Sequence, residues 1–153
     1  MKLERKILNQ SELEDCLEFW QKELALEAWQ IKAEIAKEAD MPIEDTQGTV
    51  QLVESIRTAK IFILAPEDFD GMHEFNMEQC LIHELLHVKT WAIVGGKIKR
   101  GTSRYKIYEQ EIDSLATILY NLKERSRNDK VETIKPTKRN QNIAGDSGAR
   151  TKE

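Results

Sequence analysis

Residues 80–88 of the chain read Cys-Leu-Ile-His-Glu-Leu-Leu-His-Val, and this segment decides how the rest of the sequence is interpreted. His83 and His87 are four residues apart, with Glu84 directly after the first histidine. In a helix, residues at this spacing lie one turn apart on one face, so both imidazoles can reach a single ion. Zinc takes imidazole nitrogens in a tetrahedral site, and Glu84, rotated by about 100° from His83, can accept a proton from a zinc-bound water. The segment predicts a zinc-binding helix with Glu84 as general base.

The other positions of this expected helix are apolar, which favours a metal over two hydrogen-bonded structural histidines. They are Met77, Leu81, Ile82, Leu85, Leu86 and Val88. Polar groups embedded among such side chains lose their water and need another partner. A metal ion is the simplest partner, and the pair of structural histidines stays the alternative.

A catalytic zinc site needs a third protein ligand and an open fourth position. No histidine follows His87 in the next residues, and Cys80, one turn before the first histidine, is better explained as a buried thiol. The remaining candidates lie on a later expected helix. Glu109 is favoured because it precedes the apolar stripe of that helix by one turn, and Glu111 is the alternative. Asp113 could accept a hydrogen bond from the distal nitrogen of a ligating histidine.

The pattern of apolar residues predicts an α+β domain over residues 1–125, followed by a disordered polar tail over 126–153. Helical spacing with Ser11 as N-cap and Glu14 three residues later predicts a first helix. Asn76 is the expected N-cap of the His-Glu-x-x-His helix, which Gly95-Gly96 would end. The expected helices cover 11–27, 76–93 and 105–124, and the expected strands cover 29–35, 49–54 and 59–64.

Composition narrows the class of protein further. The net charge is −4, and the last 28 residues hold seven basic and four acidic side chains, which leaves −7 on residues 1–125. An acidic body makes nucleic acid an improbable partner. No stretch approaches the roughly 18 apolar residues of a membrane span. The first 15 residues are too charged for a signal peptide, so we expect a cytoplasmic protein with no membrane contact.

His-Glu-Leu-Leu-His, followed by a helix that carries Glu109 and Asp113, resembles the gluzincin clan of zinc metallopeptidases. The layout is similar to the minimal single-domain members found in phages and prophages, which would place a phage-encoded protein in the host cytoplasm. The resemblance covers about residues 13–122 and includes Trp29-Gln30-Ile31 and Ala59-Lys60-Ile61. It implies a minimal zincin-like domain with one zinc ion per chain, Glu84 as general base and three ligands, which are His83, His87 and Glu109.

The resemblance also implies that a strand before the active-site helix pairs with an extended peptide or protein substrate. The candidates for that strand are Lys60, Ile61, Phe62, Ile63 and Leu64. Larger members use an extra histidine or tyrosine to steady the oxyanion, whereas Tyr105 and Tyr108 here are better explained as packing or surface residues. The expected function is zinc-dependent peptide hydrolysis. The alternatives are a zinc-binding regulatory module without turnover and a zinc hydrolase of a non-peptide amide.

Overall fold

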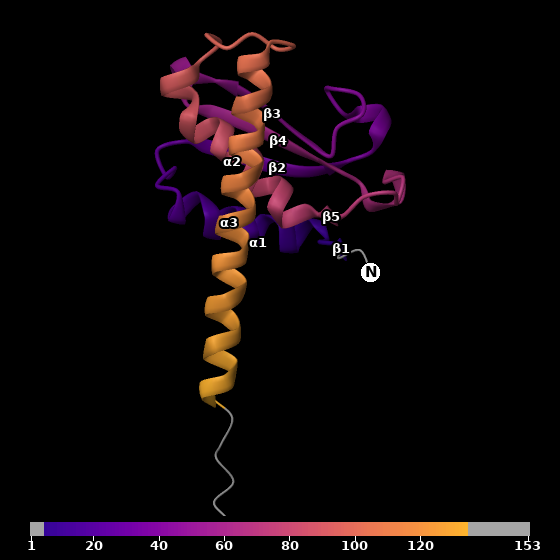
Figure 1. Cartoon of the computed structure of the whole chain (residues 1–153), viewed down its shortest axis with the longest axis vertical. Helices are drawn as coiled ribbons and strands as arrows, with labels where there is room; N and C mark the ends of the chain where they lie inside the picture. Colours follow the sequence, from indigo (N-terminus) through magenta and orange to yellow (C-terminus); the bar gives the residue numbers. More distant parts are fainter. Residues whose placement is uncertain (1–4, 135–153) are drawn as a thin grey trace, which may run out of the picture.

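Three helices and two small sheets make up residues 5–134, the part of the chain that the computed structural model describes (Figure 1). The helices are α1 (Gln10–Glu23), α2 (Met77–Val94) and α3 (Ser103–Ile134). The larger sheet contains β2 (Gln30–Ala36), β3 (Gly48–Val53) and β4 (Thr58–Leu64), and the smaller one pairs β1 (Arg5–Lys6) with β5 (Phe75–Asn76). The predicted α+β class is confirmed; the three predicted strands correspond to β2, β3 and β4, whereas the short strands β1 and β5 were not predicted.

The strand β4 lies at the centre of the larger sheet. It is parallel to β2 and antiparallel to β3, in the order β2-β4-β3. Residues 61–64 are all buried, as a continuous apolar run on a strand covered on both faces requires. Because both edges of β4 carry sheet hydrogen bonds, the expectation that Lys60–Leu64 pairs with a substrate backbone is wrong. The edge of this sheet nearest the histidines belongs to β3.

Helix α1 begins one residue earlier and ends sooner than predicted. Its N-cap is Asn9, whose side chain accepts from the backbone of Glu12 while the Glu12 side chain accepts from Asn9, so the capping box is shifted from the expected Ser11. The chain leaves the helix after Glu23, and Ala25 is in the left-handed region with φ of 51°. Local capping geometry thus decides both boundaries.

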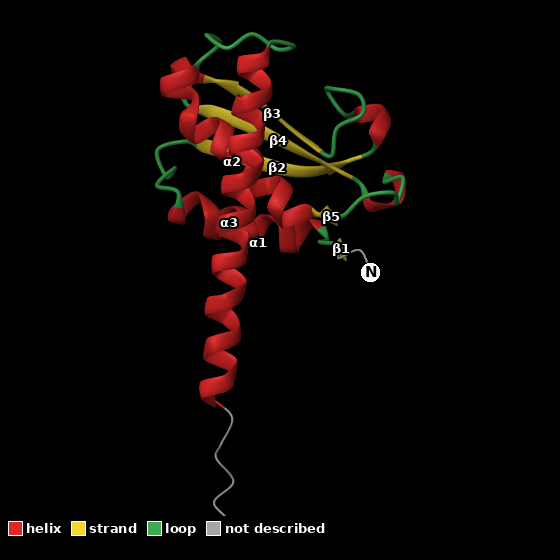
Figure 2. Cartoon of the chain, in the orientation of Figure 1, coloured by secondary structure: helices red, strands yellow, loops and turns green. Residues whose placement is uncertain are grey.

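Helix α2 packs against β3 and β4 on one side and against α3 on the other (Figure 2). Asn76 caps it as predicted, accepting a hydrogen bond from the backbone of Gln79, and Gly95 ends it with a positive φ of 25°. Its buried side chains all lie between Met77 and Val88, the part that these layers cover, whereas Lys89, Ala92 and Ile93 are exposed. The helix is therefore held over the turns that carry the histidines.

Helix α3 is longer than predicted and continues through Ile134, so residues 126–134 are helical where a disordered tail was expected. Its last turns project from the body of the domain (Figure 1). The apolar stripe that the sequence predicts for this helix is Ile112, Leu115, Ala116, Leu119 and Leu122. Ile112 and Ala116 are buried against α2, whereas Leu115 and Leu122 are exposed. Residues 135–153 of the predicted tail lie outside the described part. No helix among the described residues is long and apolar enough to cross a membrane.

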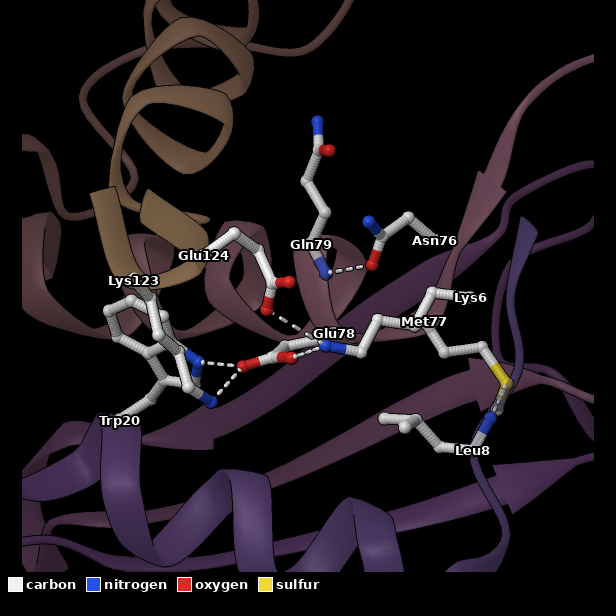
Figure 3. A network of polar contacts seen from close by, with 9 residues as sticks. All are labelled: Lys6, Leu8, Trp20, Asn76, Met77, Glu78, Gln79, Lys123 and Glu124. Carbon is white, nitrogen blue, oxygen red and sulfur yellow. Dashed lines mark hydrogen bonds and ion pairs between the residues drawn. The ribbon is translucent and has the colours of Figure 1, made fainter. Parts of the chain in front are cut away.

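A buried carboxylate near the start of α2 ties four elements together (Figure 3). Glu78 has no exposed surface, and it accepts from Lys6 of β1, from Lys123 of α3 and from the indole nitrogen of Trp20 at 2.7 Å. Burial alone would raise the pKa of Glu78, but these three donors outweigh it and lower the pKa. The cluster fixes the position of α2 between α1 and α3.

Candidate metal centre

His83 and His87 of α2 and Glu109 of α3 converge on one point, with one ligand atom from each lying within 4.8 Å of the others. The two Nε2 atoms are 3.0 Å apart. Oε2 of Glu109 is 3.3 Å from Nε2 of His83, and its Oε1 is 3.5 Å from Nε2 of His87. Zinc bonds of roughly 2.0–2.1 Å in a tetrahedral site place neighbouring ligand atoms roughly 3.3 Å apart. The observed separations fit a zinc ion.

The packing of α3 on α2 selects which acidic side chain reaches the histidines. Ile112 and Ala116 are almost fully buried and define the inward face of α3, and Glu109 lies one turn before Ile112 on that face. Glu111 is exposed and lies outside the three-residue group. The structure thus places Glu109, the favoured candidate, beside the two histidines and leaves Glu111, the alternative, in solvent.

Cys80 also lies near this centre, but its thiol makes a hydrogen bond to another side chain. It donates to the side-chain oxygen of Gln47 at 3.6 Å. Burial, with the nearby charge of Glu84, raises the pKa of Cys80 to about 12. Since a metal binds the thiolate, a thiol held protonated in this way is a poor ligand.

The distal nitrogens of both histidines are held by side chains from α3. Nδ1 of His83 lies 2.7 Å from Oδ1 of Asp113, and Nδ1 of His87 lies 3.0 Å from the hydroxyl of Tyr108. That hydroxyl is also 2.8 Å from Oγ1 of Thr90. With a metal ion bound, a proton on each Nδ1 would leave both Nε2 lone pairs available to the ion; without it, a protonated Nε2 can donate to Glu109. Sequence analysis expected Asp113 to accept from a ligating histidine but explained Tyr108 as a packing or surface residue, although its position directly before Glu109 was the available signal.

The ionisable groups at the centre favour the binding of a cation. Burial raises the pKa of Glu109, but hydrogen bonds from His83, His87 and Tyr105 outweigh it and hold the pKa well below its ordinary value. Burial lowers the pKa of His83, but the hydrogen bond with Glu109 and the charges of nearby carboxylates raise it to about 8. Oε1 of Glu109 is buried, and its 3.5 Å contact with Nε2 of His87 is too long for a normal hydrogen bond, so this oxygen lacks a full partner among the described residues. An orphaned buried carboxylate oxygen facing two imidazoles suits a metal ligand.

Glu84 is the second carboxylate of the site, and it differs from Glu109 in having no direct partner. It is 6% exposed and makes no hydrogen bond or ion pair with the described residues. Burial raises its pKa, more than the neighbouring histidines lower it. A Cβ atom at Gly48 would lie only 3.1 Å from Oε1 of Glu84, so the glycine leaves space for this carboxylate.

Two hollows meet at this carboxylate, and Gly48, His83 and Glu84 line both. One, of about 530 Å³, lies at the start of α2 beside residue Gln47. The other, of about 400 Å³, lies along β3 towards the end of α2. Together they make one open cleft that runs past the three converging side chains.

The strand β3 offers an unpaired edge along this cleft, since no described strand pairs with it on that side. The carbonyl of Gln47 accepts from the amide of Leu64 at 2.9 Å, in register with the ladder between β3 and β4. Antiparallel ladders alternate, so Gly48 and Val50 direct their N–H and C=O groups away from β4. Sequence analysis began the expected strand at residue 49 and assigned no function to Gly48, so this free edge was missed.

No protein-family model, curated protein or solved structure matches the chain. The chemistry of the site therefore rests on its own geometry. That geometry comprises three convergent ligand atoms, an unpartnered carboxylate beside them and a free strand edge along an open cleft.

Proposed function

We propose that the protein is a zinc-dependent metallopeptidase of zincin-like fold. His83, His87 and Glu109 would hold one zinc ion, and Glu84 would act as general base. The observation that carries the proposal is the convergence of one ligand atom each from His83, His87 and Glu109, together with the buried Glu109 oxygen that lacks a hydrogen-bond partner among the described residues. A glutamate ligand from the helix after His-Glu-x-x-His is also the feature on which the resemblance to gluzincins depends.

The surroundings of Glu84 support its role as the proton carrier. A bound zinc ion would supply an acidified water and polarise the scissile carbonyl. Glu84 adjoins His83 along the helix, faces the cleft and has a raised pKa, so proton transfer to it is more favourable than to an ordinary glutamate. It takes the proton from the attacking water and returns it to the leaving amine. Asp113 and Tyr108 keep the imidazoles oriented throughout.

The free edge of β3 supports a peptide rather than a small amide as substrate. The outward N–H and C=O groups of Gly48 and Val50 can pair with an extended backbone laid along the cleft. Such pairing holds a substrate by its main chain, whatever its side chains. It would place one peptide bond beside Glu84, because Gly48 adjoins that carboxylate.

Metal content and peptide hydrolysis together test the proposal. The purified protein should contain one zinc ion per chain, and the variant His83→Ala should lose it. The zinc-loaded protein should hydrolyse an unfolded protein such as reduced casein, and a chelator should stop the reaction until zinc is returned. Zinc without hydrolysis of any peptide would favour a binding module or an amide hydrolase. Absence of zinc from the folded protein would overturn the proposal altogether.

A further inference from the structure

The two hollows beside Glu84 differ in the chemistry of their walls. We name the hollow beside Gln47 the polar pocket and the one along β3 the apolar pocket. Among the described residues, no lysine or arginine lines the polar pocket. Its wall holds carboxylates and side-chain amides, including Glu74, Asp113, Asn76, Gln79 and Asn121.

The apolar pocket begins on the other side of the same carboxylate. Glu84 and the three metal-ligand candidates line this pocket too; away from them its wall is largely aliphatic and aromatic, with Val50, Leu52, Trp91, Val94 and Ile98. Arg100 stands at this pocket and donates to the hydroxyl of Tyr105 at 3.3 Å. A large apolar side chain can be buried here, whereas a lysine or arginine would meet both the apolar wall and a like charge.

The direction of β3 determines which pocket receives which end of a peptide. Gln47, in the wall of the polar pocket, directly precedes this strand, which then runs to Leu52 in the wall of the apolar pocket. A peptide added in antiparallel direction, the slightly more stable pairing, places its amino-terminal side over the apolar pocket. Its carboxyl-terminal side then enters the polar pocket.

We infer that the enzyme cleaves between a large apolar residue and a following lysine or arginine. This inference rests on the proposed function and deepens it by naming the substrate class. The polar pocket, of about 530 Å³, has room for a long side chain. The carboxylate of Glu74 is exposed and makes no ion pair with the described residues, so it is free to bind a cation. Asp113, although it accepts from His83, adds a second negative charge.

A set of short peptides tests both the chemistry and the direction. Four blocked peptides of identical alanine and glycine flanks would carry Leu-Lys, Lys-Leu, Leu-Leu or Leu-Glu at the centre. The zinc-loaded full-length protein should cleave Leu-Lys with the highest kcat/KM, at least tenfold above Lys-Leu and Leu-Glu. A faster reaction with Lys-Leu, or equal rates for all four, would overturn the inference.

Variants of the polar pocket give a second measurement. Glu74→Gln should lower the ratio of kcat/KM for Leu-Lys over Leu-Glu by about threefold, the range of a partly exposed ion pair. Asn121→Lys should lower the same ratio further, because it adds a cation to the wall. The matched control is Glu67→Gln, an exposed carboxylate outside both pockets, which should leave the ratio unchanged. Unchanged ratios in both pocket variants would also overturn the inference.

A binding measurement distinguishes a failure of this inference from a failure of the proposed function. The zinc-loaded Glu84→Gln variant should bind the Leu-Lys peptide more tightly than Leu-Glu, as measured by calorimetry without turnover. Hydrolysis of casein with no preference among the four peptides would reject the specificity while the metallopeptidase stands. Failure to hydrolyse casein and every peptide would reject both.

Discussion

Glu78 and Glu84 are two buried carboxylates on the same helix, and they have opposite surroundings. Glu78 is fully buried, accepts from Lys6, Lys123 and Trp20, and has a lowered pKa (Figure 3). Glu84 is 6% exposed, has no direct partner among the described residues and has a raised pKa. Less than two turns of helix separate them.

The difference shows how one helix can hold the domain together and also present a reactive group. A carboxylate held by three donors, here called saturated, stabilises the fold and stays ionised, which makes it a poor proton carrier. An unpartnered carboxylate beside an open cleft costs stability, and such sites are typical of functional residues. The saturated cluster at the start of α2 supports the turn that follows, where the unpartnered Glu84 lies.

The largest expected effect comes from removing the charge of the unpartnered carboxylate. Glu84→Gln should lower kcat for peptide hydrolysis by about 10³-fold, since general acid–base catalysis contributes roughly 10²–10⁴-fold. Zinc content should stay at one ion per chain, and the melting temperature should not fall, because no ion pair is lost. Turnover assays, metal analysis and calorimetry check the three points. Retained turnover would remove Glu84 from the mechanism.

The next effect concerns the third ligand. Glu109→Ala should weaken zinc binding by more than about 100-fold, since loss of a supporting partner alone costs about 10–100-fold. Glu111→Ala is the matched control, an exposed glutamate on the same helix, and should leave the affinity unchanged. Competition with a chromophoric chelator measures both. The reverse order of the two effects would reassign the ligand.

Removing the charge of Glu78, the saturated carboxylate, should lower the stability of the fold rather than the activity. Glu78→Gln should lower the free energy of unfolding by about 3 kcal/mol, because it leaves two lysines facing an uncharged group. The lowered pKa of Glu78 means that its contribution is present above the ordinary value of 4.5 and is lost as pH falls through the folded pKa. Urea unfolding at pH 7 and at pH 3 should therefore show a smaller difference between variant and wild type at pH 3. Equal differences at both pH values would contradict this account.

Zinc binding should depend on pH through His83. Its pKa of about 8 in the metal-free protein means that zinc displaces a proton below that pH, so the apparent affinity should fall up to tenfold per pH unit on acidification. In the metal-free protein the same shift contributes stability below the ordinary value of 6.5, which is lost as pH rises through about 8. Calorimetry in buffers of different ionisation enthalpy should count more protons released at pH 7 than at pH 9.5. Equal counts would argue against a protonated His83.

The smallest effect should follow a change next to Glu84. Gly48→Ala puts a methyl group about 3 Å from the carboxylate, which must then shift by a few tenths of an ångström. Since Gly48 has no positive φ, the backbone accepts alanine without strain. We expect kcat to fall about three- to tenfold with zinc affinity unchanged. Wild-type kcat in this variant would show that the position of Glu84 tolerates the displacement.

Local patterns in the sequence were sufficient for several elements of this protein. The α+β class, the Asn76 cap and the single helix carrying His83, Glu84 and His87 all follow from neighbouring residues. Helical spacing places side chains four residues apart on one face whatever else the chain does. The boundaries were less predictable, because Asn9 competes with Ser11 as the cap and α3 continues through residues 126–134.

Tertiary structure alone decided which acidic residue and which strand face the histidines. Glu109 and Glu111 are both plausible in the sequence, and only the packing of Ile112 and Ala116 against α2 turns Glu109 inward. Strand order likewise depends on pairing between distant segments, so the sequence could not show that β3 rather than β4 has the free edge. A helix face is a property of adjacent residues, whereas a neighbour across the core depends on how the whole domain packs.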